Sequence, residues 1–277
     1  MSYYRLLGFD REPFSTSPDP AFLYLSRMHG AALYRLRVAV ELRRGLSLLV
    51  GDIGTGKTTL TRRLSQIFYE DPRLDFHVIL NPMHHRDQEF LRTLLGTFHV
   101  DYESTMSPVD CFQAIERYLF KKGVEEKKTV VLLIDEAQQL SQDSLEVLRL
   151  LLNYETNEYK LLQLILVGQM ELVPRLKMLP NLWDRISLKI KMSPLDENAM
   201  REMIFFRLQQ AHFAGRTLFT PRALKLIYKK TQGFPRKVTK LCHDALEYLI
   251  MMGKDQVDRG VIEKVTRQEL TLEAVGS

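Results

Sequence analysis

Short runs of consecutive apolar residues alternate along the first two thirds of the chain with longer segments in which apolar residues recur every three or four positions. Four short runs predict buried strands, at residues 46–50, 76–80, 129–134 and 162–167. Helical spacing predicts helices at residues 28–44, 58–69, 88–97, 109–121 and 142–153, the last capped by Ser141. Buried strands that alternate with helices are typical of an α/β fold, in which helices cover both faces of a parallel sheet.

The pattern changes after residue 192, where the predicted strands stop. Residues 196–211, 221–231, 236–252 and 258–269 all show helical spacing. We therefore expect three parts: an N-terminal arm at residues 1–27, an αβα core at residues 28–192 and a small all-α domain at residues 193–277. The arm is rich in aromatic residues, and Pro18 and Pro20 exclude a helix around them. An ordered, extended segment packed on the domain behind it is expected there.

Composition narrows the class of protein. Of 277 residues, 45% are hydrophobic and 26% are charged, which is ordinary for a globular protein and excludes a disordered or collagen-like chain. The net charge of +5 suggests an anionic ligand without requiring nucleic acid or a membrane surface. Cys111 and Cys242 fit a reducing compartment. The apolar runs are shorter than the roughly 20 residues of a transmembrane helix, and the first residues lack a signal-peptide pattern. We therefore expect a cytoplasmic location.

A phosphate-binding loop is predicted between the first strand and the helix that follows it. Gly51–Thr58 matches the pattern G-x-x-x-x-G-K-[ST] in full. Glycines let consecutive backbone N–H groups point at an anion, while Lys57 can reach the β- and γ-phosphates and Thr58 offers a hydroxyl to Mg²⁺. The alternative is a glycine turn followed by a solvated lysine. The residues expected to bind nucleotide are Gly51, Asp52, Ile53, Gly54, Thr55, Gly56, Lys57, Thr58 and Thr59.

A pair of carboxylates completes the predicted site. Asp135 and Glu136 directly follow the apolar run Val130–Ile134, at the C-terminal end of a predicted strand. We expect Asp135 to hold Mg²⁺ through water, together with Thr58, and Glu136 to polarise the attacking water. ATP and Mg²⁺ are therefore the predicted cofactors. An acidic helix cap after an apolar strand is the alternative for this pair.

The chain resembles AAA+ ATPases, and more narrowly the ExeA/GspA group, over nearly its whole length. The resemblance rests on the two nucleotide motifs Gly51–Thr58 and Ile134–Gln138, on Leu166–Gln169 and Gly233–Arg236, and on the N-terminal stretches Phe9–Phe14 and Ser17–Ser26. It implies a P-loop NTPase fold, an αβα sandwich with a parallel sheet, followed by a small all-α lid domain.

The resemblance also assigns catalytic roles. Gln169 falls at the position of the polar sensor 1 residue, which would orient water against the γ-phosphate; an ordinary strand-end amide is the alternative. Arg185 falls where an arginine finger is expected, which would enter a neighbouring subunit's site and implies a homo-oligomer. A surface role for Arg185 stays open, because Arg175 lies nearby in the sequence. Arg236 matches sensor 2, which acts from the same chain, and a solvated arginine at a helix start is its alternative.

The resemblance implies an ATPase that drives or regulates the assembly of a secretion or type IV pilus-like system at the inner membrane. Longer members of the group carry a transmembrane segment and a peptidoglycan-binding domain after the ATPase, whereas this sequence ends at Ser277. We therefore expect a separate inner-membrane assembly protein as partner, and a peripheral location at that membrane.

Two other functions stay open. Transposition ATPases of the TnsC and TniB type bind DNA and share these motifs. Two basic clusters keep this hypothesis open: Arg35, Arg37, Arg43 and Arg44, and Lys225, Lys229, Lys230, Lys237 and Lys240. Solvated helix faces explain the clusters equally well, so nucleic acid is not the favoured partner. The last hypothesis is a nucleotide-binding switch with little turnover, against which Glu136 argues.

Overall fold

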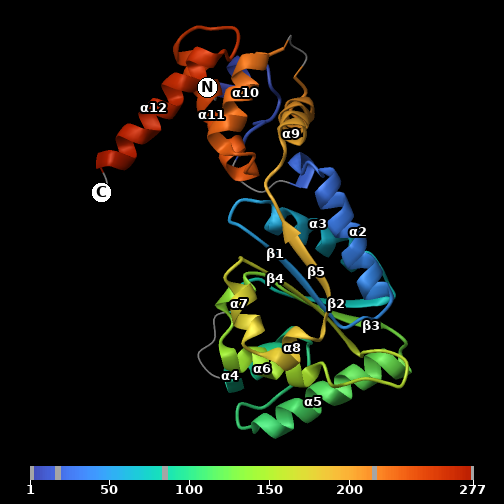
Figure 1. Cartoon of the computed structure of the whole chain (residues 1–277). Helices are drawn as coiled ribbons and strands as arrows, with labels where there is room; N and C mark the ends of the chain where they lie inside the picture. Colours follow the sequence, from blue (N-terminus) through green and yellow to red (C-terminus); the bar gives the residue numbers. More distant parts are fainter. Residues whose placement is uncertain (1–2, 16–19, 83–86, 214–216, 276–277) are drawn as a thin grey trace. The chain divides into compact units, whose positions relative to one another are not determined.

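Five parallel strands form a single sheet in the computed structural model of the chain, which describes residues 3–15, 20–82, 87–213 and 217–275 (Figure 1). The strands are β1 (Leu46–Gly51), β2 (Leu74–Ile79), β3 (Thr129–Ile134), β4 (Leu162–Gly168) and β5 (Ile186–Met192). Their order across the sheet is β2-β3-β4-β1-β5. The predicted α/β fold and its four strands are confirmed. Three of the four, β1, β3 and β4, are buried throughout, whereas β2 is an outer strand in which only Phe76 and Ile79 are buried. Because all strands are parallel, their C-terminal ends form one edge of the sheet, and the ends of β1, β3 and β4 lie side by side along it.

The fifth strand was not predicted from the sequence. In β5, every second residue is exposed, so Ser187, Lys189 and Lys191 alternate with buried apolar residues. This strand pairs only with β1 among the described strands, so it is an outer strand of the sheet. Half-exposed strands show alternating rather than continuous apolar residues, so a search for continuous runs overlooks them.

Helices cover both faces of the sheet within the unit formed by Met28–Ile53 and Leu60–Met192 (Figure 1). On one face, Leu48, Val130 and Leu164 pack in one core with residues of α4 (Asp87–Thr97), α5 (Pro108–Phe120), α6 (Gln142–Leu151), α7 (Leu172–Lys177) and α8 (Pro180–Trp183). On the other face, Leu49 and Val131 pack in a second core with α2 (Arg27–Glu41) and α3 (Lys57–Tyr69). Successive strand residues therefore pack against helices on opposite faces of the sheet, as the two-residue period of a strand requires. Ser141 caps α6 as predicted, accepting a hydrogen bond from the Ser144 backbone amide.

A polar cluster ties the end of α5 to the edge strand β2. The Tyr118 hydroxyl donates to Asp75 Oδ2 at 2.5 Å and lies 2.8 Å from His77 Nε2. Burial by itself raises the pKa of Asp75, but hydrogen bonds from His77 and Tyr118 outweigh this effect and lower the pKa to about 2. Beyond the cluster, α5 continues into a π-helical turn at Lys121–Glu125.

The second unit consists of Met1–Arg27, Gly54–Thr59 and Ser193–Ser277. Its helices are α1 (Tyr3–Leu6), the 3₁₀ turn η1 (Pro20–Phe22), α9 (Glu197–Gln210), α10 (Pro221–Thr231), α11 (Pro235–Met251) and α12 (Arg259–Val275). The arm's aromatic residues Phe9, Phe14 and Phe22 are buried in the core of these helices. Residues 16–19 lie outside the described residues, and with them the first three residues of the predicted signature stretch Ser17–Ser26, including Pro18.

Arg207 of α9 fixes the arm on this helical unit. Its guanidinium donates to the backbone carbonyls of Pro13 at 2.7 Å and Ser15 at 3.0 Å. Phe14 is fully buried and meets the ring of Phe219 edge to face. An extended segment cannot satisfy its own backbone groups, so side-chain donors such as Arg207 replace the missing helical hydrogen bonds. Within the described residues, no helix is both long and apolar enough to span a bilayer.

Candidate nucleotide site

The predicted phosphate loop connects the end of β1 to the first turn of α3. Gly54 and Gly56 have φ values of +82° and +95°, a backbone conformation that residues with a side chain rarely adopt. Helix α3 begins at Lys57, whose side chain is only 6% exposed, while Thr58 is exposed. A glycine-rich turn that runs into a helix N-terminus presents backbone N–H groups and a partial positive charge to an anion.

Arg236 lies beside Gly54 of this loop, in the unit that contains both Gly54–Thr59 and Ser193–Ser277. It is the second residue of α11, its backbone amide faces the Gly54 carbonyl oxygen at 3.4 Å, and its side chain is exposed. A Cβ atom added to Gly54 would approach Arg236 Cβ to 3.1 Å. The structure therefore brings the predicted sensor 2 arginine next to the loop, and a side chain at position 54 would crowd it.

The acidic pair occupies the end of β3. Asp135 is 3% exposed, and its Oδ1 accepts a hydrogen bond from the backbone amide of Glu136 at 2.9 Å. Its own amide donates to the carbonyl oxygen of Ile79, which ends the neighbouring strand β2. Glu136 has φ +51° and ψ +36°, the left-handed conformation. For a residue with a Cβ this conformation costs on the order of 1–2 kcal/mol, and such strained positions gather at functional sites.

The predicted sensor 1 residue, Gln169, directly follows β4. Because β4 lies between β3 and β1, the ends of these three strands carry Glu136, Gln169 and Gly51 along one edge of the sheet. The backbone amide of Gln169 donates to Oε1 of Gln138, at 3.0 Å, and Nε2 of Gln138 donates to Glu136 Oε2 at 2.5 Å. Gln138 was not among the predicted site residues, although it closes the motif Ile134–Gln138.

Arg185 is not brought together with these residues. It precedes β5, and because the strands are parallel, it lies at the opposite edge of the sheet from Glu136 and Gln169. Its guanidinium donates to the backbone carbonyl of Arg149 at 2.9 Å. Arg175, the competing candidate, donates to the carbonyl oxygens of Gln138 and Leu140. Action of Arg185 on a neighbouring subunit therefore stays a prediction.

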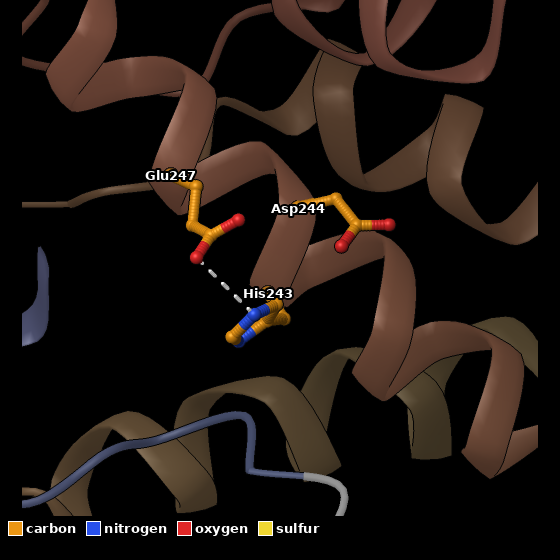
Figure 2. A group of neighbouring side chains, drawn as sticks. All are labelled: His243, Asp244 and Glu247. Carbon is orange, nitrogen blue, oxygen red and sulfur yellow. Dashed lines mark ion pairs between the residues drawn. The ribbon is translucent and has the colours of Figure 1, made fainter. Parts of the chain in front are cut away.

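Three potential metal ligands meet elsewhere among the described residues. Figure 2 shows His243, Asp244 and Glu247 on α11, with ligand atoms within 4.8 Å of one another. His243 Nε2 lies 3.5 Å from Glu247, and its Nδ1 lies 3.0 Å from a carboxylate oxygen of Glu12 and 2.9 Å from the Tyr3 hydroxyl. Both ring nitrogens thus have partners in the protein, and His243 ties the N-terminal arm to α11.

Comparison with known proteins agrees with this geometry. A family model described as an AAA domain matches residues 40–176. The chain is 36% identical to general secretion pathway protein A of Aeromonas hydrophila over 262 residues, which make up 94% of this chain and 47% of that protein. The chain therefore spans about half the length of this relative.

Solved structures support the same architecture. The chain matches the ORC2 protein of Aeropyrum pernix with a TM-score of 0.64 and 17% identity, over 92% of this chain and 71% of that one. It matches the RuvB Holliday junction branch migration motor of Thermotoga maritima with a TM-score of 0.58 and 17% identity, over 89% of this chain and 72% of that one. At these identities the similarity establishes the fold alone.

Proposed function

We propose that this chain, an ExeA/GspA-like protein of the AAA+ class, binds ATP with Mg²⁺ and hydrolyses it to drive or regulate assembly of a secretion or type IV pilus-like system. The observation that carries the proposal is the position of two motifs in the sheet. The loop Gly51–Thr58 leaves β1, and Asp135 and Glu136 leave β3, at the same edge. One motif suits phosphates, and the other supplies carboxylates to a metal ion and a water molecule.

The chemistry of the residues in these two motifs suits a magnesium nucleotide. Loop residues Gly51–Thr59 supply backbone N–H groups and the Lys57 ammonium for the phosphates. Mg²⁺ prefers oxygen ligands, which the exposed Thr58 hydroxyl and the Asp135 carboxylate provide, and it would neutralise charge that develops on the phosphates. Glu136 accepts a proton from the attacking water in this proposal, since it is the neighbouring carboxylate and is only partly buried.

The remaining site residues respond to the γ-phosphate. Gln169 orients water from the end of β4, and Arg236 contacts the phosphate from the start of α11. The closeness of Arg236 to Gly54 supports this role of Arg236. Arg185 completes the site of a neighbouring subunit, so that full activity requires a homo-oligomer. An arginine supplied in this way stabilises the charge of the transition state.

The role in secretion or pilus assembly rests on the relative general secretion pathway protein A. We infer an inner-membrane assembly protein as the partner and a peripheral location at that membrane. One member of the first basic cluster, Arg43, is engaged in packing, which makes it less available to DNA. Its guanidinium stacks over the Tyr159 ring at 4.0 Å and donates to the Thr129 hydroxyl at 3.0 Å.

Nucleotide binding and hydrolysis by the Lys57→Ala variant test the enzymatic part of the proposal. We expect the wild type to hydrolyse ATP with Mg²⁺ and to stop when EDTA removes the metal, while Lys57→Ala loses ATP affinity. Lys225→Ala, which alters an exposed lysine on α10, is the matched control and should behave as wild type. Metal-independent hydrolysis, or unchanged ATP affinity in Lys57→Ala, would contradict the proposal.

A pull-down from detergent-solubilised membranes tests the assembly role separately. The Glu136→Gln variant, loaded with ATP, should retain a secretion or pilus assembly protein that the ADP-loaded variant releases. Nucleotide-dependent retention of transposition proteins or DNA instead would favour the DNA-binding alternative and contradict the assembly role.

A further inference from the structure

The carboxamide of Gln138 joins the ends of two neighbouring strands. Its Nε2 donates to the Glu136 carboxylate after β3, and its Oε1 accepts from the Gln169 amide after β4. A primary amide is suited to this bridge because it carries donors on one atom and lone pairs on the other. The side chain is partly buried, which strengthens both hydrogen bonds relative to exposed ones.

The surroundings of Gln138 fix its position. The Arg175 guanidinium donates to the backbone carbonyls of Gln138 and Leu140, which holds the turn after β3 against α7. Gly168, the last residue of β4, leaves the space that the Gln138 side chain fills. A Cβ atom at position 168 would lie 3.0 Å from Gln138 Oε1 and 2.9 Å from Leu172 Cδ2. A side chain at position 168 would therefore crowd the Gln138 amide, and glycine leaves room for it.

Glu136 needs such a support. Its backbone is in the left-handed conformation, and its backbone amide donates to the Asp135 carboxylate. The side chain is only partly buried, so packing alone does not select one rotamer. The Gln138 amide occupies one carboxylate oxygen and leaves the other to accept a proton from water.

We propose that Gln138 is a positioning residue that holds the Glu136 carboxylate for water activation and couples its orientation to the end of β4. The inference rests on the proposed function, in which the Glu136 carboxylate activates water. Gln138 itself transfers no proton. Since Gln138 Oε1 is bound to the Gln169 amide, a shift of Gln169 toward or away from a γ-phosphate moves the carboxylate with it. ATP binding and water activation are thereby linked through one side chain.

Gln138→Met tests the role because methionine keeps the volume and removes the amide. We expect kcat to fall about 10- to 100-fold, which is less than the roughly 100- to 10,000-fold attributed to a general base because Glu136 itself is kept, with KM for ATP and the thermal midpoint close to wild type. Gln139→Met is the matched control, since Gln139 is the exposed neighbour and carries the same substitution. Equal kcat values for the two variants would overturn the inference.

A further measurement separates positioning from a structural effect. In the double variant Glu136→Gln/Gln138→Met, kcat should equal that of Glu136→Gln alone, because Gln138 acts through Glu136. Losses that multiply would also overturn the inference.

The same series distinguishes this inference from the proposed function. If wild type hydrolyses ATP, Glu136→Gln does not, and Gln138→Met equals wild type, the positioning role fails while the ATPase assignment stands. If Glu136→Gln retains full turnover, the assignment of the base fails, and the positioning role fails with it.

Discussion

Gly233 lies where the chain has no room for a side chain. It precedes α11 within the motif Gly233–Arg236, and its φ of +73° is left-handed. A Cβ atom built there would lie 1.9 Å from the carbonyl oxygen of Leu195 and 2.9 Å from the carbonyl carbon. The Leu195 amide also donates to the Gly233 carbonyl at 2.9 Å. Gly233→Ala must therefore push two backbone segments apart.

Three contributions set the size of the effect. Alanine in the left-handed conformation costs about 1–2 kcal/mol, and relief of the overlap by a backbone shift costs about 1–3 kcal/mol. Loss of the Leu195–Gly233 hydrogen bond adds about 1 kcal/mol. The free energy of unfolding should fall by about 3–6 kcal/mol in total. Gly253→Ala isolates the first contribution, because Gly253 has φ +60° and nothing within 4 Å of an added Cβ.

Urea unfolding followed by far-ultraviolet circular dichroism gives the comparison. Gly253→Ala should lower the free energy of unfolding by only about 1–2 kcal/mol, well short of the Gly233→Ala effect. The reasoning would be refuted by equal losses in the two variants, since the close approach of Leu195 would then have no energetic consequence.

Two more predictions concern Asp75 and Arg185. The Asp75 pKa of about 2 lies below the ordinary value of 3.8, so its contribution to stability is present above pH 4 and is lost as the pH falls from 4 toward 2. Tyr118→Phe removes one hydrogen-bond donor and should make the acid-induced loss of unfolding free energy shallower over that range, whereas Tyr102→Phe, at an exposed tyrosine, should not. Arg185→Ala should lower ATPase activity, and mixing it with Lys57→Ala should restore part of that activity in mixed oligomers. Absence of rescue in verified mixed oligomers would contradict action between subunits.

The sequence predicted the elements that are buried on both faces and the loops that follow them. Continuous apolar runs such as Val130–Ile134 cannot face solvent, so they specify central strands, and Gly51–Thr58 could be placed between a strand and a helix. The edge strand β5 was overlooked because its exposed face carries Ser187, Lys189 and Lys191. Local pattern also could not show that the arm's aromatic residues pack among the C-terminal helices, because that contact joins residues about two hundred positions apart.

The sequence predicted only those site residues whose roles follow from recognisable motifs. Lys57, Asp135 and Glu136 belong to motifs whose chemistry is readable from residue types. Gln138 depends on a different kind of information, namely that β4 lies next to β3 and that Gly168 leaves room beside it. Strand order is set by tertiary packing, so the bridge from Glu136 to Gln169 becomes visible only in the folded chain.

Steady-state ATP hydrolysis by Glu136→Gln, with ATP affinity measured on the same preparation, tests the central claim most directly. The variant keeps the side-chain volume and removes the proton acceptor. We expect ATP affinity close to that of wild type and kcat lower by at least about 100-fold, as for loss of a general base. Turnover equal to that of wild type, at unchanged affinity, would contradict the claim that Glu136 activates water in this ATPase.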